Sequence, residues 1–410
     1  MDDIRLGKTI SRFLGSENSE DQISLVNELA EVDYSKLVNY LRYSNLESLF
    51  YVTLRSIGIE ITNFSVLIFY KMHEEYVLRS AVTMKRSFEI KNILNQFQKN
   101  GIDIILLKGA YVAEKLYLSH SLRPMCDIDI LVREKDLNKT INIFRDLGYI
   151  TYIDSADKAD GFYEKHLPKF EAPNKMPVEV HFSISHKFNQ SIMKDIWLRT
   201  IKERLYGLEC SSFLIEDLFL YLSSHLADDN YGNKLIQLYD IHLLLQKCSI
   251  NCQFVILKAE QLNIQKSVIC TLLFLINNFK TKIPNKLTNW ALTFNYTKEI
   301  DELIERCVFI HHVGLDTEDV KLIEFLQNKT LSQKAKKLVT IFNYKKNFVC
   351  YYKIKPGSFK AHFWFIYKIY DMIIKYMKPL LANTQDKNRV DTLSISKFNA
   401  NEFLTDWFKK

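Results

Sequence analysis

The most constraining feature of the sequence is a short segment, residues 127–132, in which acidic and apolar side chains alternate. Ile128 and Ile130 are two positions apart, which is the period of a β-strand with one buried face. Asp127 and Asp129 then point together to the opposite face. Two carboxylates placed in this way repel each other unless a cation lies between them, and oxygen ligands suit Mg²⁺ or Mn²⁺. An isolated pair more often marks a solvated strand edge, so its context decides between the two interpretations.

A second strand-like segment, residues 178–182, supplies that context. Its alternation places Glu179 and His181 on one face and apolar side chains on the other. If the two strands are neighbours, three carboxylates converge, which is the number that two-ion phosphoryl transfer uses. We therefore predict Asp127, Asp129 and Glu179 as catalytic residues and metal ligands. Glu179 either bridges an ion or acts as a base toward the attacking hydroxyl.

The spacing of apolar residues divides the chain into four regions. Residues 1–98 have helical spacing, residues 99–195 alternate strand and helix, and helical spacing returns over 196–382, before a polar tail at 383–410. Glycine (11) and proline (7) are scarce, which favours long helices over an all-β fold. The prediction is an α+β protein with a mixed sheet, flanked by N-terminal and C-terminal helical regions.

Within the central block, the pattern predicts strands at residues 102–107, 128–132, 149–153 and 178–182. Amphipathic helices separate the first three strands, and Gly148 ends the second of these helices, at the position where a left-handed residue is preferred.

Positively charged residues near the first strand are suited to phosphate. Lys108 and Gly109 open the helix that follows it, where free backbone N–H groups and the lysine would cradle a phosphate. An ordinary strand-to-helix turn explains the pair equally well. Arg123 comes just before the acidic strand, and it either binds triphosphate oxygens in a bidentate manner or forms an ion pair with an acid.

Charge, cysteine usage and hydropathy restrict the setting of the protein. The formal net charge of +7 is a mild excess that suits a phosphate-rich ligand and allows RNA as a partner. Seven cysteines occur without a CxxC pair, which favours neither a disulfide framework nor a zinc site. There is no secretory leader pattern and no apolar run that could cross a bilayer, so we expect a cytoplasmic protein with no integral membrane segment.

As a set, these segments resemble the uncharacterised nucleotidyltransferase family of the polymerase-beta-like superfamily. The resemblance covers roughly residues 101–185. It rests on six segments: Leu106-Leu107-Lys108-Gly109, Leu116-Tyr117, Arg123-Pro124-Met125, Asp127-Ile128-Asp129-Ile130-Leu131-Val132, Gly148-Tyr149 and Val178-Glu179-Val180-His181. It implies an enzyme dependent on Mg²⁺ or Mn²⁺ that transfers a nucleoside monophosphate from an NTP, expected to be ATP, to an acceptor hydroxyl. The acceptor would be a protein, an RNA or a small molecule.

The resemblance also assigns roles to single residues. It implies that Asp127 and Asp129 are the metal pair and that Glu179 is the third carboxylate. Lys108 and Gly109 would take the place of the superfamily's Gly-Ser loop, but Ala110 stands where the serine would be. The phosphate contact that a hydroxyl makes elsewhere in the superfamily is therefore missing from this loop.

Residues further along the chain match the family more weakly. His225 and Asp240 look like its helical signatures and would contact the nucleotide, although a hydrogen-bonded core histidine and a paired buried aspartate are the more common outcomes. His166 and His181 are expected to support metal ligands at most.

Two features leave the function open. The aromatic segment 362–377 is most simply a core helix with snorkelling lysines, but it would also suit a membrane surface or nucleic-acid stacking. The missing hydroxyl at Ala110 favours a second hypothesis, a catalytically inactive binding or regulatory module that has kept the fold.

Overall fold

The computed structural model describes residues 1–58, 66–151, 153, 165–185, 188–232, 234–294, 297–310, 403–404 and 407–408. The chain divides into two compact units, Met1–His311 with Leu404–Lys410, and His312–Phe403. The aromatic segment 362–377 and most of the tail lie outside the described residues, so the predictions for them and the four-part division of the chain stay predictions. A search of the described helices finds none with the length and apolar character needed to cross a membrane.

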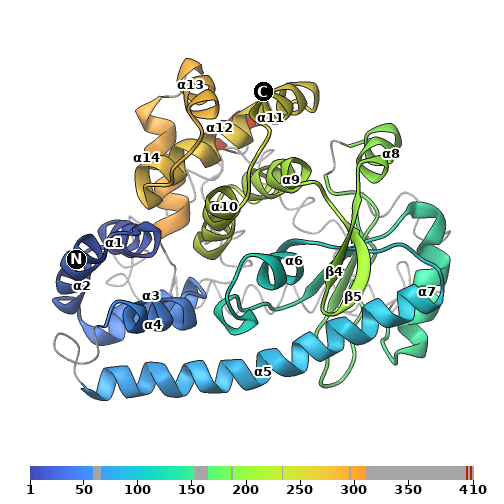
Figure 1. Ribbon diagram of the computed structural model, residues 1–410, viewed down its shortest axis with the longest axis horizontal. Coiled ribbons are helices and arrows are strands. Elements are labelled where there is room, and N and C mark those ends of the chain that lie inside the picture. The colour runs from blue at the N-terminus through green and yellow to red at the C-terminus, as the bar shows by residue number, and fades with distance from the viewer. Residues whose placement is uncertain are drawn as a thin grey trace, which may run out of the picture. The chain divides into compact units, whose positions relative to one another are not determined.

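Five helices precede the sheet: α1 (Asp3–Gly15), α2 (Ser19–Ala30), α3 (Tyr34–Tyr43), α4 (Glu47–Ser56) and α5 (Val66–Lys99). Asp2, Asn18 and Asp33 cap the first three by accepting backbone N–H groups. α5 has 34 residues and runs from the other N-terminal helices to α7 (Leu137–Asp146) (Figure 1). The chain leaves α5 through Gly101, whose φ of 65° is left-handed.

A mixed five-stranded sheet follows, in the order β3-β2-β1-β5-β4. β1 (Ile105–Leu106) is antiparallel to β2 (Ile128–Leu131) and parallel to β5 (Leu208–Ser212). β2 is parallel to β3 (Val178–His181), and β5 is antiparallel to β4 (Ile201–Leu205). The predicted α+β fold with a mixed sheet is confirmed.

Short helices connect these strands. They are α6 (Lys108–Lys115) and η1 (His120–Leu122) between β1 and β2, η2 (Glu134–Asp136) and α7 between β2 and β3, and α8 (Gln190–Leu198) before β4. The helix predicted to end at Gly148 is present as α7, and the φ of Gly148 is 79°. The left-handed glycine is therefore confirmed.

The hairpin of β4 and β5 lies beyond residue 195, in the region predicted as a C-terminal helical domain. β4 is mostly exposed and polar, so it lacks the apolar alternation that marks a half-buried strand. Tyr206 and Gly207 have φ values of 50° and 80°, as in the two-residue turns of tight hairpins. The strand predicted at 149–153 is reduced, among the described residues, to one bridge between Ile150 and Glu171.

The helices after the sheet are α9 (Ile215–Asp228), α10 (Leu235–Lys247), α11 (Cys252–Gln261), α12 (Gln265–Phe274), the π-helix η4 (Leu275–Phe279), α13 (Asn285–Thr293) and α14 (Lys298–Phe309). α1 packs against η4 and α14, so the N-terminal and later helices share one core. Gly7 permits this approach, because a Cβ there would collide with the ring of Phe309.

A buried ion pair ties α10 to the segment before β2. Arg123 donates from Nε to Oδ1 of Asp240 and from Nη2 to Oδ2, both at 2.8 Å. The Tyr117 hydroxyl donates to the same carboxylate at 2.7 Å. The side chains of Arg123 and Asp240 are only 8% and 1% exposed, so the pair is shielded from water. Of the two roles open for Arg123, the structure therefore shows the ion pair with an acid.

Asp240→Asn should reveal how strongly this pair stabilises the fold. The substitution leaves the Arg123 guanidinium buried without its counter-charge, and we expect the free energy of unfolding to fall by about 3–5 kcal/mol. Urea denaturation measures this change. Glu302→Gln, which removes the partner of Lys298 in an ion pair whose side chains are 90% and 51% exposed, is the control and should cost less than about 1 kcal/mol. If both substitutions cost the same, the Arg123 pair does not anchor α10.

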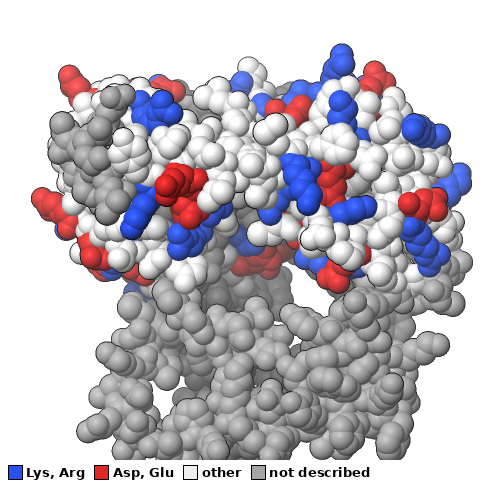
Figure 2. All heavy atoms as spheres, turned by 90° about the horizontal axis from the view of Figure 1, so that it is seen from below, with Lys and Arg blue, Asp and Glu red and all other residues white. Residues whose placement is uncertain are grey.

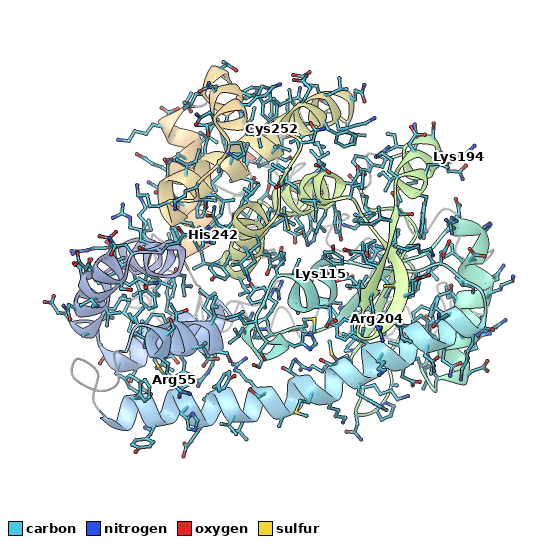
Figure 3. All side chains as sticks on the ribbon, viewed as in Figure 1. Arg55, Lys115, Lys194, Arg204, His242 and Cys252 are labelled. Atoms are coloured by element: carbon cyan, nitrogen blue, oxygen red, sulfur yellow. The ribbon has the colours of Figure 1, made fainter. Side chains whose placement is uncertain are left out.

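His242 of α10, labelled in Figure 3, is a buried histidine. Its ring stacks on Tyr239 and on Phe279, and its Nδ1 lies 2.9 Å from Oγ1 of Thr281. Burial lowers the pKa of His242 to about 4. The unfolded chain therefore takes up this proton first as the pH falls from about 6.5.

Stability should accordingly depend on pH through His242. The contribution of His242 to the free energy of unfolding is fully present above about pH 6.5 and declines as the pH falls from about 6.5 to 4. Below about pH 4 this residue causes no further loss of stability. We expect His242→Gln to reduce the slope in that window by up to about 1.4 kcal/mol per pH unit, measured by urea denaturation at several pH values. Identical slopes in the two proteins would contradict a buried neutral imidazole.

Candidate metal centre

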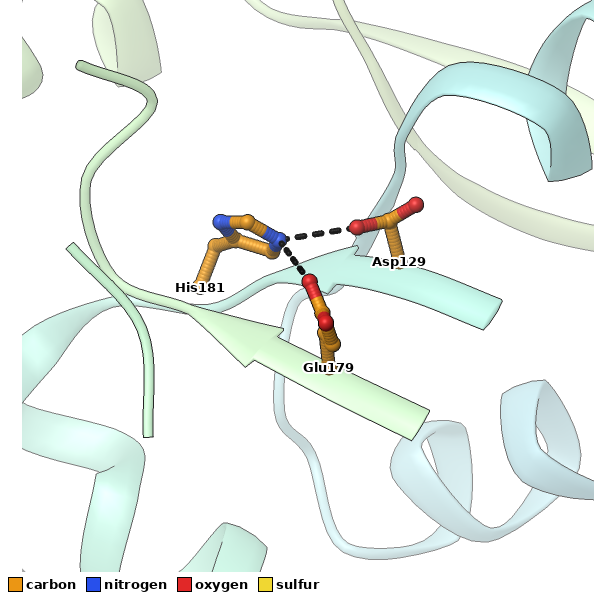
Figure 4. Close-up of side chains that lie close together, drawn as sticks. All are labelled: Asp129, Glu179 and His181. Atoms are coloured by element: carbon orange, nitrogen blue, oxygen red, sulfur yellow. Dashed lines mark hydrogen bonds and ion pairs between the residues drawn. The ribbon is translucent and has the colours of Figure 1, made fainter. Parts of the chain in front are cut away.

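The register of β2 and β3 brings the acidic side chains of the two strands together. Asp129 pairs with Glu179 and Leu131 pairs with His181 in this parallel ladder. Alternate residues share a face of the sheet, so the side chains of Asp129, Glu179 and His181 project to the same side (Figure 4). The isoleucine and valine residues between them are fully buried, and this burial on the other face fixes the register.

His181 joins the two carboxylates. Its Nε2 lies 2.9 Å from Oδ1 of Asp129 and 3.6 Å from Oε2 of Glu179 (Figure 4). One ligand atom from each of the three residues lies within 4.8 Å of the other two. Two carboxylates and an imidazole at this spacing fit a divalent cation, and the carboxylate oxygens are the donors that Mg²⁺ and Mn²⁺ prefer. Among the described residues, Nδ1 of His181 is buried without a hydrogen-bond partner, so only Nε2 holds the ring by hydrogen bonding.

Lys108 offsets the charge of Asp129. α6 begins at Lys108, whose φ of 43° is left-handed, a costly conformation for a residue other than glycine. Its Nζ lies 2.9 Å from Oδ1 of Asp129, and the N–H of Leu107 donates to the carbonyl oxygen of Asp129 at 2.9 Å. Burial alone would raise the pKa of Asp129, but Lys108 and His181 outweigh burial and hold that pKa well below its usual value. Asp129 is therefore ionised at neutral pH.

Gly109 has a packing role in this turn. A Cβ at Gly109 would lie 2.9 Å from Cγ of Met125, so any larger residue would have to displace that side chain. The positive φ belongs to Lys108 and not to Gly109. The phosphate cradle at these two residues stays a prediction.

Asp127 immediately precedes β2 and reaches the cluster through Lys169. Nζ of Lys169 lies 3.2 Å from Oδ2 of Asp127 and 3.0 Å from Oε1 of Glu179. The three predicted carboxylates thus face one region, but Asp127 is linked to Glu179 by an ammonium group. Glu179 is not turned away from either aspartate.

The electrostatic environment distinguishes the acids. Burial raises the pKa of Asp127, and the negative charge of Asp129 raises it further. Burial also acts to raise the pKa of Glu179, but the hydrogen bond to His181 and the ammonium of Lys169 lower it to about 2. Glu179 is therefore a weak base at neutral pH.

His225 lies on α9, close enough to Lys108 to be affected by its charge. Burial and the positive charge of Lys108 lower the pKa of His225 to about 3, so the imidazole is neutral. Its ring stacks on Tyr221, whose buried hydroxyl has no hydrogen-bond partner among the described residues. His225 is thus a neutral ring close to Lys108, and its contact with a nucleotide stays a prediction.

Arg123 and Asp240 are not brought to the acidic cluster by any contact among the described residues. The two residues form an ion pair with each other, and Arg123 is thus the charged partner that the buried Asp240 requires. We assign them to the support of the site, and a direct nucleotide contact stays a prediction.

For two residues of the cluster, the structure shows contacts that the sequence did not predict. His181 contacts both carboxylates, and the alternation that places it on the face of Glu179 was the available signal. Lys169 carried no signal, because no strand pattern precedes residue 178 in that segment and its position depends on isolated bridges such as Phe170 to Val178.

Comparison with known proteins identifies the family. A family model described as an uncharacterised nucleotidyltransferase matches residues 30–279, which is more than half of the 410-residue chain. No curated protein and no solved structure matches. The matched range contains the paired strands, Lys108 and α9. The chain therefore belongs to the family of uncharacterised nucleotidyltransferases.

Proposed function

We propose that this protein is a metal-dependent enzyme that transfers a nucleoside monophosphate from an NTP to an acceptor hydroxyl. The observation that carries the proposal is the convergence of Asp129, Glu179 and His181 on adjacent strands beside Lys108. ATP is the expected donor, and the acceptor is a protein, an RNA or a small molecule. The family supports a nucleotidyl transfer, but it names neither substrate.

The carboxylates of Asp127, Asp129 and Glu179 would hold Mg²⁺ or Mn²⁺. When bound, such ions neutralise the triphosphate and activate the attacking hydroxyl. Asp129 and Glu179 are ionised at neutral pH and are therefore ready to bind a cation. A pKa of about 2 makes Glu179 a poor general base, so the bridging role is favoured over the base role. His181 holds these two carboxylates in position, and the two-ion arrangement is part of the proposal.

Residues around the acids would position the nucleotide. Lys108 carries a largely shielded positive charge next to Asp129 and would offset phosphate charge there. His225 would contribute hydrogen bonds from a neutral ring, which attracts no additional anion. A phosphate contact at Gly109 would have to come from the backbone N–H groups at the start of α6, because the side of Gly109 where a Cβ would lie is filled by Met125.

The acceptor is the least constrained part of the proposal. On the face shown in Figure 2, basic and acidic side chains of the described residues lie interspersed, so this face does not favour RNA over a protein or a small molecule. RNA as a partner would require binding that weakens steeply with salt. The cytoplasmic location rests on the sequence pattern alone.

The second candidate is a catalytically inactive module with the same fold. The absence of a hydroxyl at Ala110 and the ammonium of Lys169 between two acids favour it. The clustering of carboxylates that repel one another opposes it, because a scaffold gains nothing physical from keeping them together. A melting temperature that is the same with and without Mg²⁺ and each NTP would support the inactive module.

Asp129→Asn and Glu179→Gln should each slow transfer strongly in a protein that still folds. Each substitution keeps the shape of the side chain but removes a charged metal ligand, and we expect the rate to fall at least about a hundredfold. The measurement is transfer of label from each α-labelled NTP to components of a cell lysate, with Mg²⁺ or Mn²⁺. Circular dichroism checks that both variants are folded.

Asp146→Asn is the matched control, because Asp146 is an exposed acid of α7 outside the cluster, and it should retain wild-type activity. Transfer that survives both Asp129→Asn and Glu179→Gln would contradict the proposed function. If no labelled product forms in the wild type with any NTP, the inactive module becomes the better account.

A further inference from the structure

Lys169 is a cation placed between two of the acids that the metal centre requires. Its Nζ contacts Oδ2 of Asp127 and Oε1 of Glu179, while the other oxygen of Glu179 faces His181. We propose that Lys169 is an exchangeable counter-cation, which a divalent ion displaces from the two carboxylates and which then binds the triphosphate of the nucleotide.

The backbone on either side of Lys169 is fixed. The N–H of Leu167 donates to the carbonyl of Val180 at 2.8 Å, and Phe170 and Val178 exchange two hydrogen bonds of 2.9 Å each. Leu167 and Phe170 are 1% and 0% exposed, so they anchor the segment in the core beside β3. Lys169 therefore stays near the acids wherever its side chain turns.

The side chain of Lys169 has room to move. It is 43% exposed, whereas the side chain of Lys108 is 18% exposed and pairs with the buried Asp129. The carboxylates that Lys169 contacts, Asp127 and Glu179, are 32% and 18% exposed, against 7% for Asp129. Water reaches the Lys169 ammonium more readily than that of Lys108, and a flexible lysine side chain loses entropy when it is fixed. Of these two lysines, Lys169 is the one that can leave its carboxylates at small cost.

Competition for the same oxygens drives the exchange. A divalent ion held between Oδ2 of Asp127 and Oε1 of Glu179 would compete for the oxygens that Lys169 now contacts, and the two cations would repel each other. The displaced ammonium stays tethered beside the centre, where the nucleotide brings a new concentration of negative charge. Lysine is a compact point charge with a flexible stem, which suits such an exchange.

The first half of this inference, competition with the metal, is independent of catalysis. The second half, transfer to the phosphates, rests on the proposed function. The two halves predict opposite effects of one substitution, so they can be tested separately. Lys169→Met removes the charge and keeps the length of the side chain.

We expect Lys169→Met in the full chain to bind Mn²⁺ alone roughly three- to tenfold more tightly than the wild type. Electron paramagnetic resonance of free Mn²⁺ measures this. In the presence of Mg²⁺, the same variant should bind α,β-methylene-ATP and inorganic tripolyphosphate more weakly, by a similar factor, as measured by calorimetry. Lys169→Arg retains the charge and should lie closer to the wild type in both measurements.

Lys175→Met is the matched control. Lys175 belongs to the same stretch of chain, but its Nζ donates to the carbonyl of Leu147 and lies 5.1 Å from the centre of the Tyr149 ring. Removing this charge should change neither affinity. If Lys169→Met and Lys175→Met changed the two affinities equally, the effect would come from the net charge of the protein and not from the position of Lys169. That result would contradict the inference.

The outcomes also separate this inference from the proposed function. Mn²⁺ affinity that is unchanged or weaker in Lys169→Met overturns the competition. Tripolyphosphate affinity that is unchanged or tighter in the variant overturns the transfer to the phosphates. Tighter Mn²⁺ binding in a protein whose wild type transfers no nucleotide would uphold the competition while the proposed function fails.

Discussion

Carboxylates crowded on adjacent strands repel one another, and the structure around β2 and β3 is arranged to offset that repulsion. Lys108 forms an ion pair with Asp129, and Lys169 forms ion pairs with Asp127 and Glu179. His181 lies between Asp129 and Glu179. These groups supply the positive charge and hydrogen bonds that lower the pKa of Asp129 and Glu179 despite their burial. An arrangement of this kind is poised to receive a cation, because Asp129 and Glu179 remain charged at neutral pH.

The rest of the described fold keeps this cluster in place. The parallel register of β2 and β3 depends on apolar residues buried on the opposite face, and a slip of one residue would turn the acids into the core. The turn before β2 is tied to α10 by Arg123 and Asp240, and α9 brings His225 to the edge of the site. The N-terminal helices contribute indirectly, since α1 packs on the later helices and α5 packs along the sheet domain.

Much of the site could be predicted from the sequence, because alternation with one buried face determines both the strand and the direction of its polar side chains. Asp129 and Glu179 follow from this rule. The bond from His181 to Asp129 depends on the relative register of two strands, which neither strand specifies alone. The hairpin of β4 and β5 is short and largely polar, so it carries no comparable pattern.

Contacts between segments that are far apart in the sequence could not be predicted from the alternation of apolar and polar residues. Arg123 and Asp240 lie 117 positions apart, and sequence reasoning indicated only that each would need a charged partner or a ligand. Lys169 lies 42 positions from Asp127 and reaches it because isolated bridges place its segment beside β3. Long-range pairing of this sort depends on the packed fold and not on local periodicity.

The most direct measurement of the central claim is anomalous X-ray scattering from crystals of the protein grown with Mn²⁺ and α,β-methylene-ATP. The account predicts an anomalous peak for a Mn²⁺ ion within bonding distance of carboxylate oxygens of Asp129 and Glu179, with the triphosphate beside it. A peak located elsewhere, or a triphosphate bound away from these two residues, would contradict the assignment of the acidic cluster as the metal centre.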